Sequence, residues 1–244
     1  MLARAMPPGD PAPSADEILA RARAYPFPRP KSSVIVTGER VLQLTDVAAP
    51  ELGTAPRKAV LAYGSNASPS GLRWKFPAGS DAPFALVRGT LHDFDVVYSS
   101  HIAVYGSVPA TLQVSPGTEV ETFVALLTEH QLELVTEWEI NARLERLRGL
   151  RLELERGEAP AEVLAYVSRH GCLTAGNKEI AIAEVPARGR RFPTMTQPEV
   201  LEYVRHAVAP ELSMEDFITG NVSHYERARR YTKELRKTAK PFLS

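Results

Sequence analysis

Hydrophobic and polar positions alternate most densely between residues 58 and 185, where short apolar runs predict a series of β-strands. The run at 59–63 carries no charge and ends at a Gly-Ser-Asn break, which is typical of a buried strand entering a turn. Further strands are predicted at 84–91, 94–98, 110–114, 120–127 and 179–185. The middle of the chain is therefore expected to form a sheet.

Three hairpins are predicted, at 34–44, 110–127 and 150–167. The second has the clearest turn, Ser115-Pro116-Gly117-Thr118. Pro116 presets φ for the first central position of this turn, and Gly117 tolerates positive φ at the second. In the third hairpin, residues 150–155 and 163–167 would pair around Gly157.

Helices are predicted at both ends of the chain. Ser14 followed by Glu17 forms a capping-box pattern, and the helix that it opens must end before Pro26. From Pro198 onward the pattern is helical again, and its last stretch, 222–237, is rich in arginine and lysine.

A further helix is predicted within the strand-rich region. The capping-box pattern of Thr128 and Gln131 opens it, and it is expected to run to about Leu144. Many closely spaced strands, one inserted helix and then C-terminal helices indicate a mixed α+β domain around an antiparallel sheet or small barrel. We assign residues 57–244 to this domain and residues 1–56 to a partly proline-rich N-terminal extension.

Composition narrows the classes of function. Lys+Arg and Asp+Glu both number 29, so no net charge favours nucleic acid or an anionic membrane as a partner, and a small molecule fits better. The basic last helix also contains Glu226 and Glu234 between its cations, as is typical of a solvated helix face.

The first 14 residues contain no apolar run typical of a signal peptide or anchor. The single cysteine, Cys172, indicates a reducing compartment, and we expect a cytoplasmic protein.

Nucleophilic and metal chemistry find little support in the sequence. A thiol hydrolase would use Cys172 with His170, but residues two apart do not face each other on a helix, and nothing nearby would activate the thiol. The six histidines show no paired ligand spacing, so no metal site is predicted.

Glu139 is the acidic residue of the inserted helix that points inward. At about 100° per residue, Leu132, Val135 and Trp138 form a buried stripe, and Glu139 falls between the first two. The other glutamates of this helix, Glu129, Glu133 and Glu137, face water. An inward carboxylate suits acid/base catalysis because burial disfavours its charged form. The alternative is a structural glutamate paired with Arg143.

The turn Tyr63-Gly64-Ser65-Asn66 is the second candidate site. It follows a buried strand, so its backbone N–H groups can converge without partners in the sheet, and glycine allows another group to approach closely. Such a turn can bind a carboxylate or an oxyanion. Gly-Ser-Asn is also ordinary turn composition, which is the structural alternative.

Three segments together resemble the γ-glutamylcyclotransferase-like family in order and spacing. Residues 60–66 are similar to its substrate-binding Tyr-Gly-Ser-Asn loop, residues 109–120 to its central hairpin, and residues 134–139 to the segment with its catalytic glutamate. The resemblance spans 58–185. It implies that Glu139 is the catalytic acid/base. It also implies a substrate-binding role for Leu61, Ala62, Tyr63, Gly64, Ser65 and Asn66.

The resemblance implies a small mixed β-barrel flanked by helices, with the loop on one side of a pocket and the glutamate on the other. The substrate would be a small γ-glutamyl amide, cyclised to 5-oxoproline with release of an amine or amino acid and without metal or cofactor. Two departures from the family, Ala142 in place of an aromatic residue and Trp138 beside the glutamate, leave open a non-catalytic binding or interaction domain of the same fold. A homodimer is also left open.

Overall fold

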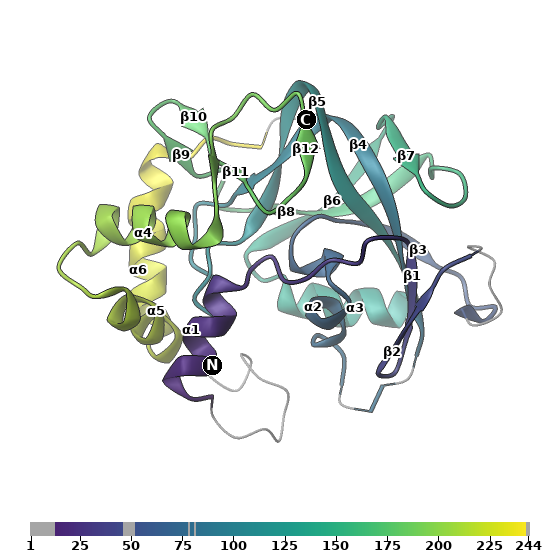
Figure 1. Cartoon of the computed structure of the whole chain (residues 1–244), viewed down its shortest axis with the longest axis horizontal. Helices are drawn as coiled ribbons and strands as arrows, with labels where there is room; N and C mark the ends of the chain where they lie inside the picture. Colours follow the sequence, from purple (N-terminus) through teal and green to yellow (C-terminus); the bar gives the residue numbers. More distant parts are fainter. Residues whose placement is uncertain (1–12, 46–51, 78, 81, 243–244) are drawn as a thin grey trace.

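A large twisted sheet lies at the centre of the molecule (Figure 1). The computed structural model describes residues 13–45, 52–77, 79–80 and 82–242. Helices α1, α4, α5 and α6 gather on one side of the sheet, and α2 and α3 lie at one end of it (Figure 1). The mixed α+β class predicted from the order of elements is confirmed.

The main path of the sheet runs β13-β11-β4-β5-β3-β8-β6. Its strands in that order are β13 (Thr194–Met195), β11 (Ala181–Ile182), β4 (Phe84–Tyr98), β5 (Ala110–Leu127), β3 (Lys58–Ala62), β8 (Glu162–Ser168) and β6 (Ala142–Arg148). The strands attached beside this path are β1 (Val34–Thr37), β2 (Arg40–Gln43), β7 (Leu152–Leu154) and β12 (Ala187–Arg188). The two ends of the path do not pair with each other among the described strands, so the sheet is open there.

The hairpin predicted around Ser115–Thr118 is wrong. Both halves of β5 pair antiparallel with β4, and Phe94 faces Val114 while His92 faces Glu119. The intervening residues therefore bulge from one continuous strand. Gly117 does adopt positive φ (80°), but its N–H donates to the Asp93 carboxylate at 2.8 Å instead of closing a hairpin. The chain reverses between Tyr98 and Ala110.

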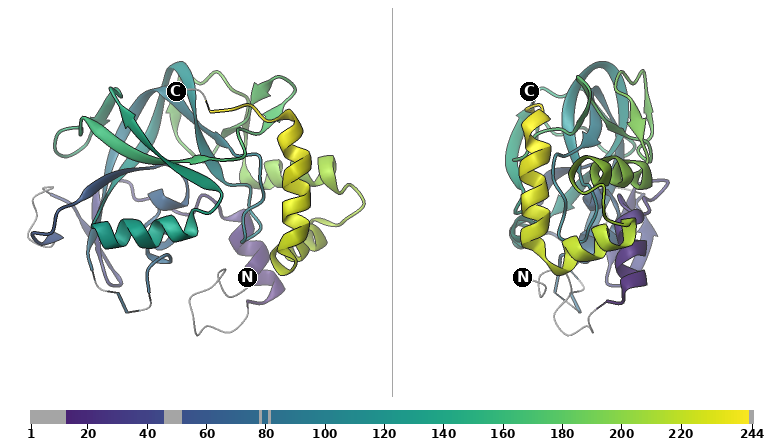
Figure 2. Two further views of the ribbon diagram at one scale, coloured as in Figure 1. Left: turned by 180° about the vertical axis from the view of Figure 1, so that it is seen from behind. Right: turned by 90° about the vertical axis from the view of Figure 1, so that its left-hand side faces the viewer.

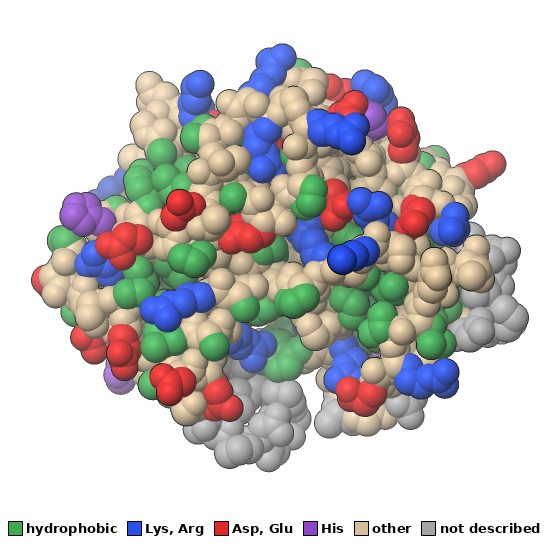
Figure 3. Space-filling view, in the orientation of Figure 1, with side chains coloured by type: hydrophobic (Ala, Val, Ile, Leu, Met, Phe, Trp, Pro, Cys, Tyr) green, Lys and Arg blue, Asp and Glu red, His purple; other side chains and the backbone are tan. Residues whose placement is uncertain are grey.

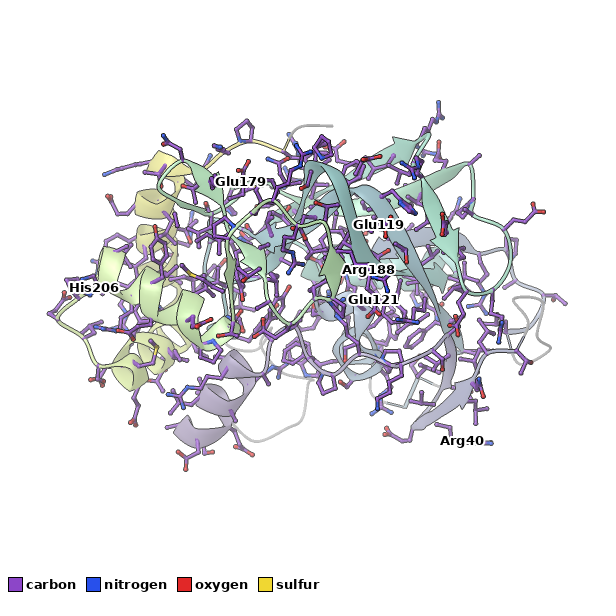
Figure 4. The ribbon with its side chains drawn as sticks, turned by 45° about the horizontal axis from the view of Figure 1, so that its top comes forward. Arg40, Glu119, Glu121, Glu179, Arg188 and His206 are labelled. Atoms are coloured by element: carbon purple, nitrogen blue, oxygen red, sulfur yellow. The ribbon has the colours of Figure 1, made fainter. Side chains whose placement is uncertain are left out.

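The predicted pairing of 150–155 with 163–167 is also wrong. Strand β7 pairs with β4, whereas β8 pairs antiparallel with β6 and parallel with β3. Strands β9 (Thr174–Ala175) and β10 (Lys178–Glu179) form a separate two-stranded sheet, so only part of the strand predicted at 179–185 joins the large sheet. Strand β12 lies along β5 and places Arg188 opposite Glu119, near Glu121 (Figure 4).

The inserted helix α3 (Glu129–Trp138) ends earlier than predicted. Its capping box at Thr128 and Gln131 is present as expected. Glu139 caps the C-terminus outside helical geometry (φ −86°, ψ 43°). The residues predicted to continue the helix instead form β6, because seven residue pairs with β8 outweigh local helix preference.

The described helices besides α3 are α1 (Ala15–Arg23), α2 (Pro69–Arg73), α4 (Gln197–Val208), α5 (Met214–Ser223) and α6 (Tyr225–Leu235). Helix α6 runs along one side of the molecule, as the views in Figure 2 show, and contacts α4 and α5. None of the helices in the described ranges has the length and apolar character needed to cross a membrane.

The described residues before residue 56 pack into the main core. Leu19 and Ala22 of α1 and the following Tyr25 belong to the same buried cluster as Leu61 of β3. The hairpin predicted at 34–44 is confirmed as β1 and β2, and β1 also pairs with β4. Part of the predicted extension, residues 1–12 and 46–51, lies outside the described residues. The domain boundary at 56 stays a prediction.

Candidate active site

A pocket with about 100 Å³ of free volume lies between α1, the turn after β3 and the end of α3. The surface is hollowed between α1 and α2, and hydrophobic and basic side chains face the hollow (Figure 3). Drug-sized ligands occupy pockets of about 300–1,000 Å³. The free volume therefore fits a small ligand.

The structure brings most of the predicted site residues to this pocket. Its wall includes Leu61, Tyr63, Gly64, Ser65, Asn66 and Glu139. Ala62 is the exception. Its side chain packs with Val60 in a buried hydrophobic cluster separate from the one that contains Leu61 and Tyr63. The reason is that successive residues of a strand face opposite sides of the sheet.

The turn after β3 is held tightly in place. Residues Ser65–Ala67 form a short 3₁₀ helix, in which the Ala67 N–H donates to the Gly64 carbonyl at 3.0 Å. The Tyr25 hydroxyl lies against the turn and accepts a hydrogen bond from the Ala110 N–H at 2.7 Å. The N–H groups of Gly64 and Asn66 have no acceptor within the described part of the chain. They are therefore unpaired donors in a turn whose residues line the pocket.

The Gly64→Ala substitution is expected to destabilise the protein by about 1–3 kcal/mol, as overpacking does. A Cβ at this position would overlap with the Tyr25 hydroxyl and lie 3.0 Å from the Ala110 Cβ. The cost, measured by urea unfolding, should be smaller in a Tyr25→Phe background, which removes the overlapping oxygen. An equal cost in both backgrounds would contradict this explanation.

Glu139 forms a polar cluster with Asn66 and Lys75. The Asn66 side-chain amide donates to Oε1 of Glu139 at 2.9 Å, and the Lys75 ammonium forms an ion pair with the same oxygen. Lys75 also donates to Oδ1 of Asn66 at 2.7 Å. The Lys75 side chain is 8% exposed and the Glu139 side chain 23%. Both side chains thus line the pocket, and Glu139 is the more exposed of the two.

The two oxygens of Glu139 differ in their contacts. Both contacts use Oε1, and Oε2 receives no hydrogen bond from any residue that the structure describes. The predicted inward position of Glu139 is confirmed, although the chain has left the helix at this residue.

Lys75 was not identified from the sequence. Its position is fixed partly by Trp138, whose indole N–H donates to the Lys75 carbonyl at 3.1 Å. In the sequence, Lys75 stands between two large apolar residues, Trp74 and Phe76. This pattern indicates a segment that lies against the core, with the lysine stem packed along it. That pattern cannot identify Glu139 as the partner, because the two residues are 64 positions apart.

Two buried tyrosines contribute neutral hydroxyl groups to the pocket. Burial raises the pKa of Tyr25 and of Tyr63 well above the usual range. The Tyr63 hydroxyl donates to the Tyr166 carbonyl. Because both groups stay protonated at physiological pH, neither can serve as a general base.

His101, which follows β4, and Ser168, at the end of β8, also line the pocket and contact a buried polar group behind them. The Ser99 hydroxyl lies 2.6 Å from Nδ1 of His101 and 2.6 Å from the Ser168 hydroxyl. The His101 ring lies 4.9 Å from that of His170. Burial lowers the pKa of both histidines, so both rings are neutral near pH 7. The sequence pattern predicted no metal site at the histidines, and it did not place His101 at the pocket.

Cys172 has the properties of a core residue. It is fully buried, and burial raises the pKa of its thiol to about 12. A neutral thiol is a poor nucleophile, which argues against the thiol-hydrolase alternative. Across the described ranges, no group of three or more His, Cys, Asp or Glu side chains is arranged to hold a metal ion.

No protein-family model and no curated protein matches the sequence. The contacts in the pocket and the resemblance of the three sequence segments are therefore the observations that bear on function. Among the described residues, the Glu139 carboxylate has one oxygen without a hydrogen bond, and the turn has two backbone N–H groups without an acceptor. The combination suits proton transfer next to a carbonyl group whose oxygen gains negative charge.

Proposed function

We propose that the protein is a γ-glutamylcyclotransferase-like enzyme that converts a γ-glutamyl amide to 5-oxoproline and releases an amine or amino acid. The observation that carries the proposal is that the Glu139 carboxylate and the turn Gly64–Asn66 line one small pocket. The mixed α+β sheet is compatible with this family, and membership of the family and its barrel-like fold are part of the proposal.

In the proposed reaction, Oε2 of Glu139 accepts a proton from the α-ammonium of the substrate. The freed amine attacks the γ-carbonyl carbon and forms the C–N bond of the ring, while the carbonyl electrons move to oxygen. The Gly64 and Asn66 N–H groups stabilise this oxyanion. When the C=O bond re-forms, the bond to the leaving nitrogen breaks, and that nitrogen receives the proton from Glu139. A second proton passes from the ring nitrogen to the released amine.

The pocket would contribute mainly orientation. The amine and the γ-carbonyl belong to one molecule, so their attack is already favoured once the chain of the substrate is folded into ring-closing shape. Asn66 and Lys75 hold one oxygen of Glu139. This leaves the other oxygen at a fixed position for the substrate ammonium.

The proposal is tested by incubating the protein with γ-glutamyl amino acids and γ-glutamylamines and measuring 5-oxoproline. The matched control ligands are the α-glutamyl isomers, whose amino group cannot form the five-membered ring with the amide carbonyl. We expect 5-oxoproline from at least one γ-linked compound and none from the α-linked ones. Binding of a γ-linked compound with no 5-oxoproline would instead favour the non-catalytic binding domain.

A further inference from the structure

Arg21 lies at the pocket on a surface of aromatic rings. It comes from α1, and its guanidinium carbon lies 3.8 Å from the centre of the Trp74 ring. Trp74 in turn lies 4.8 Å from Trp138, between ring centres. All three side chains line the same pocket as Glu139. We call Arg21, Trp74 and Trp138 the aromatic rim.

The Arg21 guanidinium has no anionic partner among the residues that the structure describes. It forms no hydrogen bond and no ion pair there, although a guanidinium carries five N–H donors. Glu17, one helical turn earlier, is engaged elsewhere, because its carboxylate accepts from the Ser14 N–H at 2.8 Å and the Ser14 hydroxyl at 2.9 Å. Burial lowers the pKa of Arg21, which reflects a charge partly withdrawn from water.

The charges of the pocket leave Arg21 uncompensated. Lys75 is paired with Glu139, so the cation and anion at the centre of the site balance each other. A half-buried arginine without a counter-ion favours an anionic ligand, and its planar fork matches a carboxylate. The contact with the Trp74 ring does not use the N–H donors of the guanidinium, which have no partner among the described residues and are available to such a ligand.

The position of the rim indicates which part of the ligand it contacts. Trp138 directly precedes Glu139, and Trp74 directly precedes Lys75. Both tryptophans are therefore chain neighbours of the Glu139–Lys75 pair, and Arg21 of α1 lies against Trp74. A group attached to the leaving nitrogen would lie against the tryptophans, with Arg21 beyond them.

We propose that Arg21 binds a carboxylate on the leaving group, and that the substrates are γ-glutamyl amino acids in preference to γ-glutamylamines. This inference rests on the proposed function for the orientation of the ligand. The aromatic rim would hold an apolar or aromatic side chain of the departing amino acid. Arg21 is then a specificity-determining residue supplied by the N-terminal helix.

The test compares γ-glutamylphenylalanine with γ-glutamylphenethylamine, which differ only in the carboxylate of the leaving group. Dissociation constants are measured by calorimetry in a Glu139→Gln, Lys75→Gln background, so that turnover does not interfere and no unpaired Lys75 ammonium competes with Arg21 for the carboxylate. We expect a preference of roughly ten- to a hundredfold for the carboxylate-bearing ligand, in line with a charge-assisted hydrogen bond. Adding Arg21→Gln should bring the ratio close to one, and Arg21→Lys should keep part of the preference.

Arg23→Gln is the matched control, because Arg23 is an exposed arginine on the same helix and does not line the pocket. It should leave the ratio unchanged. A ratio near one before any change at Arg21, or no binding of γ-glutamylphenylalanine, would overturn the inference. An equal loss of both ligands on Arg21→Gln, in a variant whose thermal midpoint is unchanged, would also overturn it.

The two proposals can fail separately. If the wild-type protein makes no 5-oxoproline but the binding ratio responds to Arg21 as expected, the catalytic proposal fails and the carboxylate site stands. If 5-oxoproline forms while the ratio is insensitive to Arg21, the specificity inference fails and the enzyme proposal stands.

Discussion

Replacement of Glu139 by glutamine is expected to lower the rate of 5-oxoproline formation by about 10²–10⁴-fold, the usual contribution of a general acid/base. Glutamine has nearly the same size and can still accept the hydrogen bond from Asn66, which is 2.9 Å long in the native protein. It cannot take a proton from the substrate ammonium. The loss should therefore lie in kcat and much less in KM.

Glu137→Gln is the matched control for this experiment. Glu137 lies two residues earlier, is exposed and does not line the pocket. Its replacement should leave the rate unchanged. A Glu139→Gln variant that keeps most of its activity while Glu137→Gln behaves as wild type would exclude Glu139 as the acid/base.

The substitution Asp95→Ala is expected to lower the free energy of unfolding by about 3–5 kcal/mol, as breaking one side of a buried ion pair does. Asp95 of β4 has a side chain that is 0% exposed, and Nε and Nη2 of Arg190 donate to its two oxygens at 2.9 and 3.0 Å. Arg190 also donates to the carbonyls of Ile182 and Val185. The Asp95–Arg190 ion pair thus holds the segment between β11 and β13 against β4.

Urea unfolding measures this cost. An apolar pair, Asp95→Leu with Arg190→Met, should recover much of the stability, because no unpaired charge is then left buried. Glu226→Ala, which removes an exposed ion pair with Arg229, is the surface comparison and should change stability little. If Asp95→Ala cost no more than Glu226→Ala, the buried pair would not be a stabilising contact.

Local patterns in the sequence were sufficient to predict several helices and strands. They were also sufficient to select Glu139 and the turn at 63–66 as candidate site residues. The Ser14 capping box fixes the start of α1, and the box at Thr128 fixes the start of α3, since these contacts join residues three apart. The apolar run before Tyr63 predicts the strand β3 and the turn that follows it. The amphipathic pattern of α3 places Glu139 on the inward side.

The ends of elements and the pairing of strands were decided by tertiary contacts. Gly117 has the positive φ that its turn pattern predicted, yet the chain continues in one strand, because β4 pairs with both halves of β5. Residues 142–144 lost their predicted helix to pairing with β8. In both cases hydrogen bonds to distant strands outweigh a local preference.

The residues that line the pocket show most clearly which features local sequence patterns determine and which depend on tertiary contacts. The sequence by itself determined that a strand, a turn with available N–H groups and an inward carboxylate exist in this chain. Only the tertiary structure decided that Lys75 is buried against Glu139, that Tyr25 supports the turn, and that Arg21 lines the pocket without a described counter-ion. These contacts join residues that are tens of positions apart, and they form because α1 packs into the same core as β3, which no local pattern encodes.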